Sequence, residues 1–380
     1  MTIKKVKITP KKVLSYLADN AVTVMFVIIC AFGIPLSGLS ANFLFSEILT
    51  RLARNSFLVL SLLIPIMAGM GLNFGMTLGA MAGEIGLILV IDWNIIGIPG
   101  IILAMIISTP ISILLGWICG KILNMAKGRE MVTSYIIGFF MNGIYQLIVL
   151  YAMGSLIPLA SKTLILPRGY GVRNTVNLIT VRKVFDNLIN VRIFNTNVPV
   201  FTFIIIVFLC IFIVWFRKTK LGQDMKAVGQ DLEVSKSAGI KEERTRIIAI
   251  IISTVFAGIG MIIYLQNMGT LNTYNSHTQI GMFSIAALLV GGASVNKAKI
   301  SNVFLGIILF HIMFIVSPYA GKNLVGQAMI GEYFRVFVSY GVITLSLVLY
   351  ELKRRRAKSR IGAQLALDQE DEEEVKNETE

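Results

Sequence analysis

Long apolar runs dominate the chain, and short polar stretches separate them. A helix needs roughly 20 apolar residues to cross the hydrocarbon core of a membrane, and such runs recur along the sequence. A transmembrane β-barrel would instead show short segments that alternate apolar and polar positions. The pattern predicts an all-α, polytopic bundle of about ten spans. These are expected at residues 21–38, 55–71, 73–91, 97–120, 131–157, 199–216, 247–265, 281–295, 301–318 and 331–351.

The composition agrees with insertion into a membrane. Hydrophobic residues make up 55% of the chain, charged residues make up 15%, and the mean hydropathy is +0.76. Soluble globular domains are less apolar, and about a quarter of their residues are charged. The sequence is therefore that of an integral membrane protein.

Lysine and arginine gather in flanks that fall on one side of the expected bundle. Because short cytoplasmic flanks of membrane proteins are enriched in these residues, this side, with both chain ends, is expected to face the cytoplasm. The net charge of +14 then reflects topology and contact with lipid headgroups, without nucleic acid. The expected parts are a basic N-terminus at 1–20, a transmembrane domain at 21–351 with an outer loop at 159–198 and a cytoplasmic loop at 217–246, and a basic, then acidic, disordered tail at 352–380.

Two groups of basic residues conflict with this topology. Arg51 and Arg54 precede the second expected span and would face outward, as would the basic residues of the loop at 159–198. Long loops follow the charge rule weakly, so the second conflict is tolerable. The arginine pair leaves the orientation of the early helices open.

Sequence patterns of enzymatic chemistry are missing. The chain has no GxxxxGK[ST] phosphate loop, no HExxH pair and no GxSxG elbow. Cys30, Cys119 and Cys210 lie inside expected spans without ligand spacing, and only two histidines are present, so neither a catalytic residue nor a metal site is expected. Transport or channel activity is left.

The cytoplasmic loop at 217–246 has a helical pattern of its own. Leu221, Met225, Val228 and Leu232 recur at the spacing of one helix face. A second short helix is expected from Val234 to Ala238, where Gly239 can adopt the left-handed conformation that ends helices. The pattern alone is compatible with an ordinary solvated connector or with a docking element for a cytoplasmic partner.

The stretch TKLGQDMKAVGQDLEVSKSAGI, at 219–240, resembles the cytoplasmic loop of ABC importer permeases for simple sugars, nucleosides and branched-chain amino acids. Lys226 and Asp231 stand where the family usually has Arg and Asn. The resemblance implies a coupling helix that seats in a groove of a separate ATPase subunit. The coupling residues that it implies are Gly222, Lys226, Ala227, Val228, Gly229, Ser237, Ala238, Gly239 and Ile240.

Three further stretches resemble the same family, namely GREMVTSYIIGFFMN at 128–142, GLNFGMTLGAMAGEIG at 71–86 and GMFSIAALLVGG at 281–292. The resemblance implies a multi-pass permease of the bacterial cytoplasmic membrane that binds no cofactor, with ATP and Mg held by the partner ATPase. It also implies a second permease subunit and an extracytoplasmic solute-binding protein. A simple sugar or nucleoside is the favoured solute. A branched-chain amino acid and an ion-coupled secondary transporter are the alternatives.

Several side chains are candidates for the solute pathway. The glycine-rich stretch that includes 71–86 allows close helix contact and local unwinding, which membranes tolerate where backbone lines a cavity or is buried in protein. Plain packing of small residues explains it as well. An acid inside a span, such as Glu84, is by default a functional candidate, unless it reaches the interface. The full set is Asn73, Phe74, Glu84, Asn142, Tyr145, Gln146, Phe283 and Ser284.

The outer loop contains a second amphipathic pattern. Leu178, Val181, Phe185 and Leu188 share one face if residues 176–194 form a helix. Such a helix would lie on the outer membrane surface or contact the solute-binding protein.

Overall fold

All ten apolar runs form helices in the computed structural model, which describes residues 20–193, 196–349 and 351–352. Six helices of this part are long and apolar enough to cross a membrane, and the bent pair α9 and α10 would add a seventh. The helices at 21–37, 76–92 and 276–290 have 17, 17 and 15 residues, fewer than the roughly 20 of a full span. The helical, polytopic class is confirmed, and the count of about ten spans stays a prediction.

The first half of the chain comprises α2 (Ala21–Ser37), α3 (Ala41–Ser61), α4 (Leu63–Met67), α5 (Met76–Asp92), α6 (Gly97–Met125), α7 (Glu130–Leu147) and the π-helical turn η1 (Ile148–Ala152). An outer segment follows with β1 (Thr175–Asn177), α8 (Val184–Leu188), β2 (Asn190–Ile193) and β3 (Thr196–Pro199). The second half comprises α9 (Val200–Phe216), α10 (Lys220–Gln230), α11 (Leu232–Ser237), α12 (Glu242–Met268), β4 (Thr270–Asn272), α13 (Ser276–Val290), α14 (Ile300–Val325) and a helix at Ala328–Leu349.

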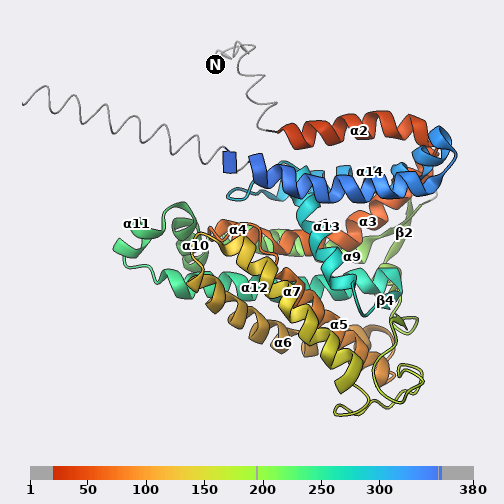
Figure 1. Cartoon of the computed structure of the whole chain (residues 1–380), viewed down its shortest axis with the longest axis horizontal. Helices are drawn as coiled ribbons and strands as arrows, with labels where there is room; N and C mark the ends of the chain where they lie inside the picture. Colours follow the sequence, from red (N-terminus) through yellow and green to blue (C-terminus); the bar gives the residue numbers. More distant parts are fainter. Residues whose placement is uncertain (1–19, 194–195, 350, 353–380) are drawn as a thin grey trace, which may run out of the picture.

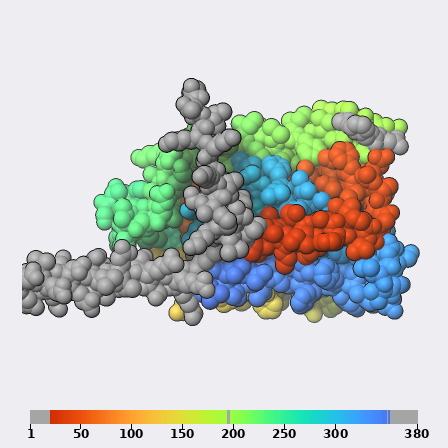
Figure 2. Space-filling view, turned by 90° about the horizontal axis from the view of Figure 1, so that it is seen from above, coloured from red at the N-terminus to blue at the C-terminus, as the bar shows by residue number. Residues whose placement is uncertain are grey.

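Helix α12 runs through the middle of the bundle and packs against α3, α5 and α6. Small residues let these backbones approach closely, as is common between membrane helices. A Cβ atom at Gly79 of α5 would lie 2.0 Å from the Thr254 carbonyl oxygen of α12. Helices α2 and α14 lie side by side along one face of the bundle (Figure 1). The short helices α10 and α11 lie at one end of its long axis and the outer segment at the other (Figures 1 and 2).

Helix α3 corrects the expected start of the second span. It begins at Ala41 rather than at residue 55, so Arg51 and Arg54 lie within a helix instead of in a flank. Arg51 pairs with Glu47 one turn earlier at 3.3 Å, and the Arg54 guanidinium lies 5.5 Å from the centre of the Tyr264 ring. These contacts accommodate both arginines near the end of α12 that leads into β4.

The prediction of a helix at 176–194 is wrong. Strand β1 pairs with β4 and strand β2 pairs with β3, and among the described residues 176–193 only the five of α8 are helical. Lys183 adopts a left-handed conformation with a φ of 53°, and its backbone N–H donates to the Gln266 carbonyl at 2.7 Å. Leu178, Val181 and Phe185 are buried, whereas Leu188 is exposed. Their spacing reflects burial in a tertiary core rather than a helix face.

The break between α4 and α5 shows that the glycine-rich stretch unwinds locally, which was one of the two interpretations of its sequence. Residues 68–75 are not helical, and Gly69 and Gly71 have φ angles of +73° and +69°. Leu72 and Asn73 are nearly inaccessible to solvent, so the freed backbone is buried in protein, as this environment requires.

Candidate solute pathway

The unwound segment presents Asn73 and Phe74 to the interior. The Asn73 Oδ1 atom accepts a hydrogen bond from the Gly75 N–H at 2.9 Å, and its Nδ2 atom is buried without a partner among the described residues. The Phe74 N–H donates to the Ser134 hydroxyl of α7 at 3.1 Å, and the Thr77 hydroxyl donates to the Phe74 carbonyl at 3.0 Å. Side chains of α5 and α7 thus replace the helical partners that the break removes.

Two cavities meet at Phe74. The larger, of about 700 Å³, lies toward the end of the bundle that carries α10. The smaller, of about 40 Å³, lies between the unwound segment, α7 and the start of α13. Phe74, Tyr135 and Met282 line both cavities, and the Phe74 and Tyr135 rings pack edge to face with centres 5.5 Å apart. An aromatic pair therefore stands between the two spaces.

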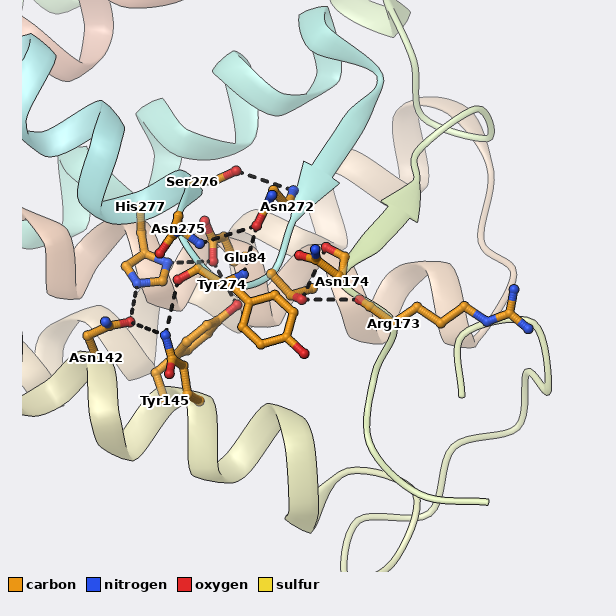
Figure 3. Close-up of polar contacts among 12 residues, drawn as sticks. Glu84, Asn142, Tyr145, Arg173, Asn174, Asn272, Tyr274, Asn275, Ser276 and His277 are labelled. Atoms are coloured by element: carbon orange, nitrogen blue, oxygen red, sulfur yellow. Dashed lines mark hydrogen bonds and ion pairs between the residues drawn. The ribbon is translucent and has the colours of Figure 1, made fainter. Parts of the chain in front are cut away.

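A buried polar cluster lies next to the smaller cavity (Figure 3). The Tyr145 hydroxyl of α7 donates to Glu84 Oε2 of α5 at 2.7 Å. His277 of α13 places Nδ1 2.9 Å from the same oxygen and Nε2 2.8 Å from Asn142 Oδ1 of α7. Glu84 and His277 have no exposed surface. The cluster ties three helices together, and its members come from positions 193 residues apart at most.

Two further contacts extend the cluster along α7. The Gln146 Nε2 atom lies 3.4 Å from Asn142 Oδ1 and 3.3 Å from the backbone carbonyl of Tyr274, just before α13. Asn142 also lines the smaller cavity. This asparagine is therefore the member of the cluster that connects it to the open space.

The described residues contain no group of three or more His, Cys, Asp or Glu side chains that could hold a metal ion. The side chains that line the smaller cavity are aromatic, hydroxyl, amide and thioether groups, and none of them is charged. Glu84 faces His277 rather than the cavity. The lining of the smaller cavity is therefore uncharged, polar and aromatic.

At the other end of the larger cavity, α10 contacts the unwound segment. A Cβ atom at Gly229 would lie 2.3 Å from the Met67 carbonyl oxygen and 2.9 Å from the Gly69 nitrogen. One at Gly69 would lie 2.7 Å from the Gly229 Cα atom. The two backbones touch directly, and both glycines line the larger cavity.

Local caps shape α10 and α11. The Thr219 hydroxyl accepts from the Gly222 N–H at 3.2 Å, and the Asp231 carboxylate accepts from the Glu233 and Val234 N–H groups at 3.0 Å each. Asp231 thus starts a new helix, and for this reason Leu232 belongs to α11 rather than to the first helix face. Gly239 has a φ of +79°, as expected for the end of α11.

Comparison with known proteins assigns the chain to a family. A family model described as "Branched-chain amino acid transport system / permease component" matches residues 44–347. The chain belongs to this permease family. No solved structure matches it.

Individual relatives of this permease are transport proteins for different solutes. It is 25% identical to the nucleoside ABC transporter permease NupB of Lactococcus lactis subsp. cremoris over 58% of its length and 59% of that protein. It is 23% identical to the autoinducer 2 import permease LsrD of Photorhabdus luminescens over 71% of its length and 74% of that protein. It is 28% identical to the L-arabinose transport permease AraH of Escherichia coli over 40% of its length and 44% of that protein. The chain thus spans about three fifths of the nucleoside relative.

The permease brings most of the expected pathway residues together. Those that line a cavity or join the polar cluster are Phe74, Glu84, Asn142, Tyr145 and Gln146, and Asn73 lies beside them in the unwound segment. Phe283 instead packs against the Phe310 and Phe314 rings of α14. Ser284 is buried, and neither residue lines the two cavities.

The expected coupling residues lie on and next to α10 and α11. Gly222 and Val228 are buried, Lys226 lines a cavity of about 490 Å³ beside α4 and α9, and Ala227 is half-buried. Ser237, Ala238 and Gly239 are exposed, and Ile240 is half-buried. An ATPase contact at these positions stays a prediction.

Sequence reasoning missed His277, Tyr135 and the Tyr274 carbonyl. His277 precedes the span expected at 281–295, so the sequence places it outside the membrane helix. Helix α13 begins at Ser276, so the histidine lies within its first turn. The Asn- and Thr-rich stretch at 272–279 was the only available signal, since polar residues this close to an apolar run can belong to the helix.

Proposed function

We propose that the chain is the membrane-spanning permease subunit of an ATP-driven ABC importer in a bacterial cytoplasmic membrane. It would carry an uncharged polar solute, a simple sugar or a nucleoside. The relatives include permeases named for nucleosides and for sugars. The uncharged lining of the smaller cavity supports the same class, because the ammonium and carboxylate of an amino acid both need charged or multiple polar partners when they are desolvated.

The contact between Gly229 and the unwound segment carries the proposal. The end of the bundle with α10 and α11 would face the cytoplasm, together with both chain ends, and would seat on a separate ATPase chain that binds ATP and Mg. Because α10 touches Met67 and Gly69 directly, displacement of α10 would move the segment that holds Phe74. Access to the smaller cavity would then change with the nucleotide state of the ATPase, which is a shift between two conformations.

Two further partners complete the proposed importer. A second permease subunit would cover the side of α7 whose aromatic and polar residues border the smaller cavity, among them Phe139 and Asn142. An extracytoplasmic solute-binding protein would dock on the outer segment at the opposite end from α10 (Figure 1). Polar side chains on a membrane helix face protein or a water-filled path rather than lipid.

Affinity purification of the detergent-solubilised chain from its native cells, followed by mass spectrometry, tests the proposal. We expect a phosphate-loop ATPase to co-purify and to be lost when Ser237 and Ala238 are replaced by bulky residues. Both are exposed in the structure, so the bundle itself should remain folded. Recovery of the chain alone, with solute uptake that ATP depletion leaves unchanged, would contradict the proposal.

A further inference from the structure

The hydrogen-bond chain that ends at Asn142 has a fixed direction. A backbone carbonyl only accepts, so the Tyr274 carbonyl requires that Gln146 turn its Nε2 toward it. The same Nε2 faces Asn142 Oδ1. The opposite orientation of the Asn142 amide would bring two N–H donors together at this contact. Gln146 is therefore one of two side chains that hold the Asn142 oxygen toward the cluster.

His277 is the second side chain that holds the Asn142 oxygen, and its contact is the shorter of the two. Because Nε2 of His277 faces the oxygen of Asn142 at 2.8 Å, this ring nitrogen carries a proton and donates it. On the other side of the ring, Nδ1 lies 2.9 Å from Glu84 Oε2, so the imidazole ring is held between Glu84 and Asn142.

These contacts leave one group of Asn142 unused. Its Oδ1 accepts from His277 and Gln146, whereas its Nδ2 makes no hydrogen bond to a described residue. Asn142 lines the smaller cavity, and Figure 3 shows its oxygen turned toward His277 and its nitrogen turned away. The cavity thus receives an N–H donor with a direction set by the cluster behind it.

We propose that His277 is a positioning residue that directs the Asn142 amide N–H groups into the smaller cavity, where they bind an acceptor atom of an uncharged solute. The acceptor would be a ring nitrogen or carbonyl of a base, or an oxygen of a sugar. Phe74 and Tyr135 supply an apolar surface beside it, which suits a sugar ring or base that packs on an aromatic side chain. This inference rests on the proposed function and specifies how its solute is recognised.

Uptake kinetics in cells that lack the native gene and carry each variant test the inference. The probe is the first of labelled adenosine, uridine, arabinose and galactose that the wild-type chain takes up. The probe is compared with analogues that each lack one hydrogen-bond acceptor, which are deaza-nucleosides for a nucleoside and deoxyfluoro sugars for a sugar. If the wild type takes up none of the four in an ATP-dependent manner, the proposed function itself fails.

The variants separate positioning from folding. Asn142→Asp keeps the side-chain volume but replaces the donor by an acceptor, and His277→Gln removes the ring that holds it. We expect both to raise the KM of the probe about five- to tenfold, the effect of one hydrogen bond, with little change in the maximal rate. For one of the analogues that lack an acceptor, both variants should also take up the probe and the analogue with similar KM values, whereas the wild type should prefer the probe.

His311→Gln is the matched control, because His311 is also a buried histidine but lies in α14, outside the cluster and both cavities. It should leave KM and discrimination unchanged. The inference is overturned if His277→Gln behaves like His311→Gln. It is also overturned if Asn142→Asp lowers only the amount of folded protein and leaves the analogue pattern of the wild type.

Discussion

The outer segment and the cytoplasmic loop have similar sequence patterns but form different secondary structures. Both interrupt apolar runs, and both place apolar residues at helical spacing. The loop forms α10 and α11 close to where they were expected, whereas the outer segment forms short strands and one short helix. In the loop, Thr219, Asp231 and Gly239 fix the helix ends locally. In the outer segment, Asp186 takes its partners from distant parts of the chain, namely Thr202, Gln266 and Asn267.

The difference shows when apolar residues at helical spacing predict a helix correctly. Capping groups within a few residues of a pattern give it independent support, because they satisfy the free N–H and C=O groups at helix ends. The outer segment has no such support, and a buried carboxylate needs several donors wherever they are found. Each prediction below tests one side of this comparison, in order of expected size.

The largest effect is expected at the point where the loop meets the bundle. A Gly229→Leu side chain would collide with the Met67 carbonyl and the Gly69 nitrogen, which cannot move without shifting the unwound segment. We expect solute uptake to fall at least about a hundredfold, since small misplacements at a functional site have effects of this size. Uptake per amount of folded, membrane-inserted protein is the measurement. Gly341→Ala is the control, because a Cβ there meets nothing within 4 Å, and an equal loss in both variants would refute the coupling role.

The next largest effect is expected in the outer segment. Asp186→Ala leaves the donors of Thr202, Gln266 and Asn267 buried without an acceptor, which should lower the free energy of unfolding by roughly 3 kcal/mol or more. Thermal unfolding of the purified protein measures the change. Asp186→Asn retains one acceptor oxygen and should lose less. Equal stability of wild type and Asp186→Ala would show that the distant contacts do not hold this segment.

A smaller and more local effect is expected at the cap of α11. Asp231→Ala removes the acceptor of the Glu233 and Val234 N–H groups, at a cost of about 1 kcal/mol. Hydrogen exchange should accelerate at residues 232–237 and remain unchanged in α12. Asp231→Asn, which also caps helices well, should exchange like the wild type. Faster exchange throughout the bundle would contradict a purely local role for this cap.

The smallest effect is expected at Leu188, and its contrast with Val181 separates the two interpretations of the outer pattern. Leu188 is 46% exposed and Val181 is fully buried, although an amphipathic helix would place both on one face. Leu188→Ser should change the free energy of unfolding by at most about 0.5 kcal/mol, as surface substitutions do. Val181→Ser should cost about 2 kcal/mol or more. Similar losses from both substitutions, measured by thermal unfolding, would favour the helix that the structure does not contain.

The polar cluster shows how far site prediction from the sequence could reach. Glu84 was identified because an acid inside an apolar run is costly, and Asn142, Tyr145 and Gln146 because their spacing places them on one face of α7. His277 was missed because its importance depends on Glu84 and Asn142, which lie 193 and 135 residues away. Phe283 was a pathway candidate from the sequence, as Phe74 was, but it packs against α14. The sequence around an aromatic residue does not show which neighbour its ring contacts.

The sequence by itself determined the helical membrane class, the approximate positions of most apolar helices and the two capped helices of the cytoplasmic loop, and it offered local unwinding of the glycine-rich stretch as one of two interpretations. These features depend on hydropathy, glycine conformation and caps, all of which act between residues close in the chain. The tertiary structure alone decided that Gly229 lies against Gly69, that Asp186 reorganises the outer segment and that His277 joins Glu84 to Asn142. A buried polar group or a close backbone contact is stable only with partners that the fold brings together, and no local pattern records them.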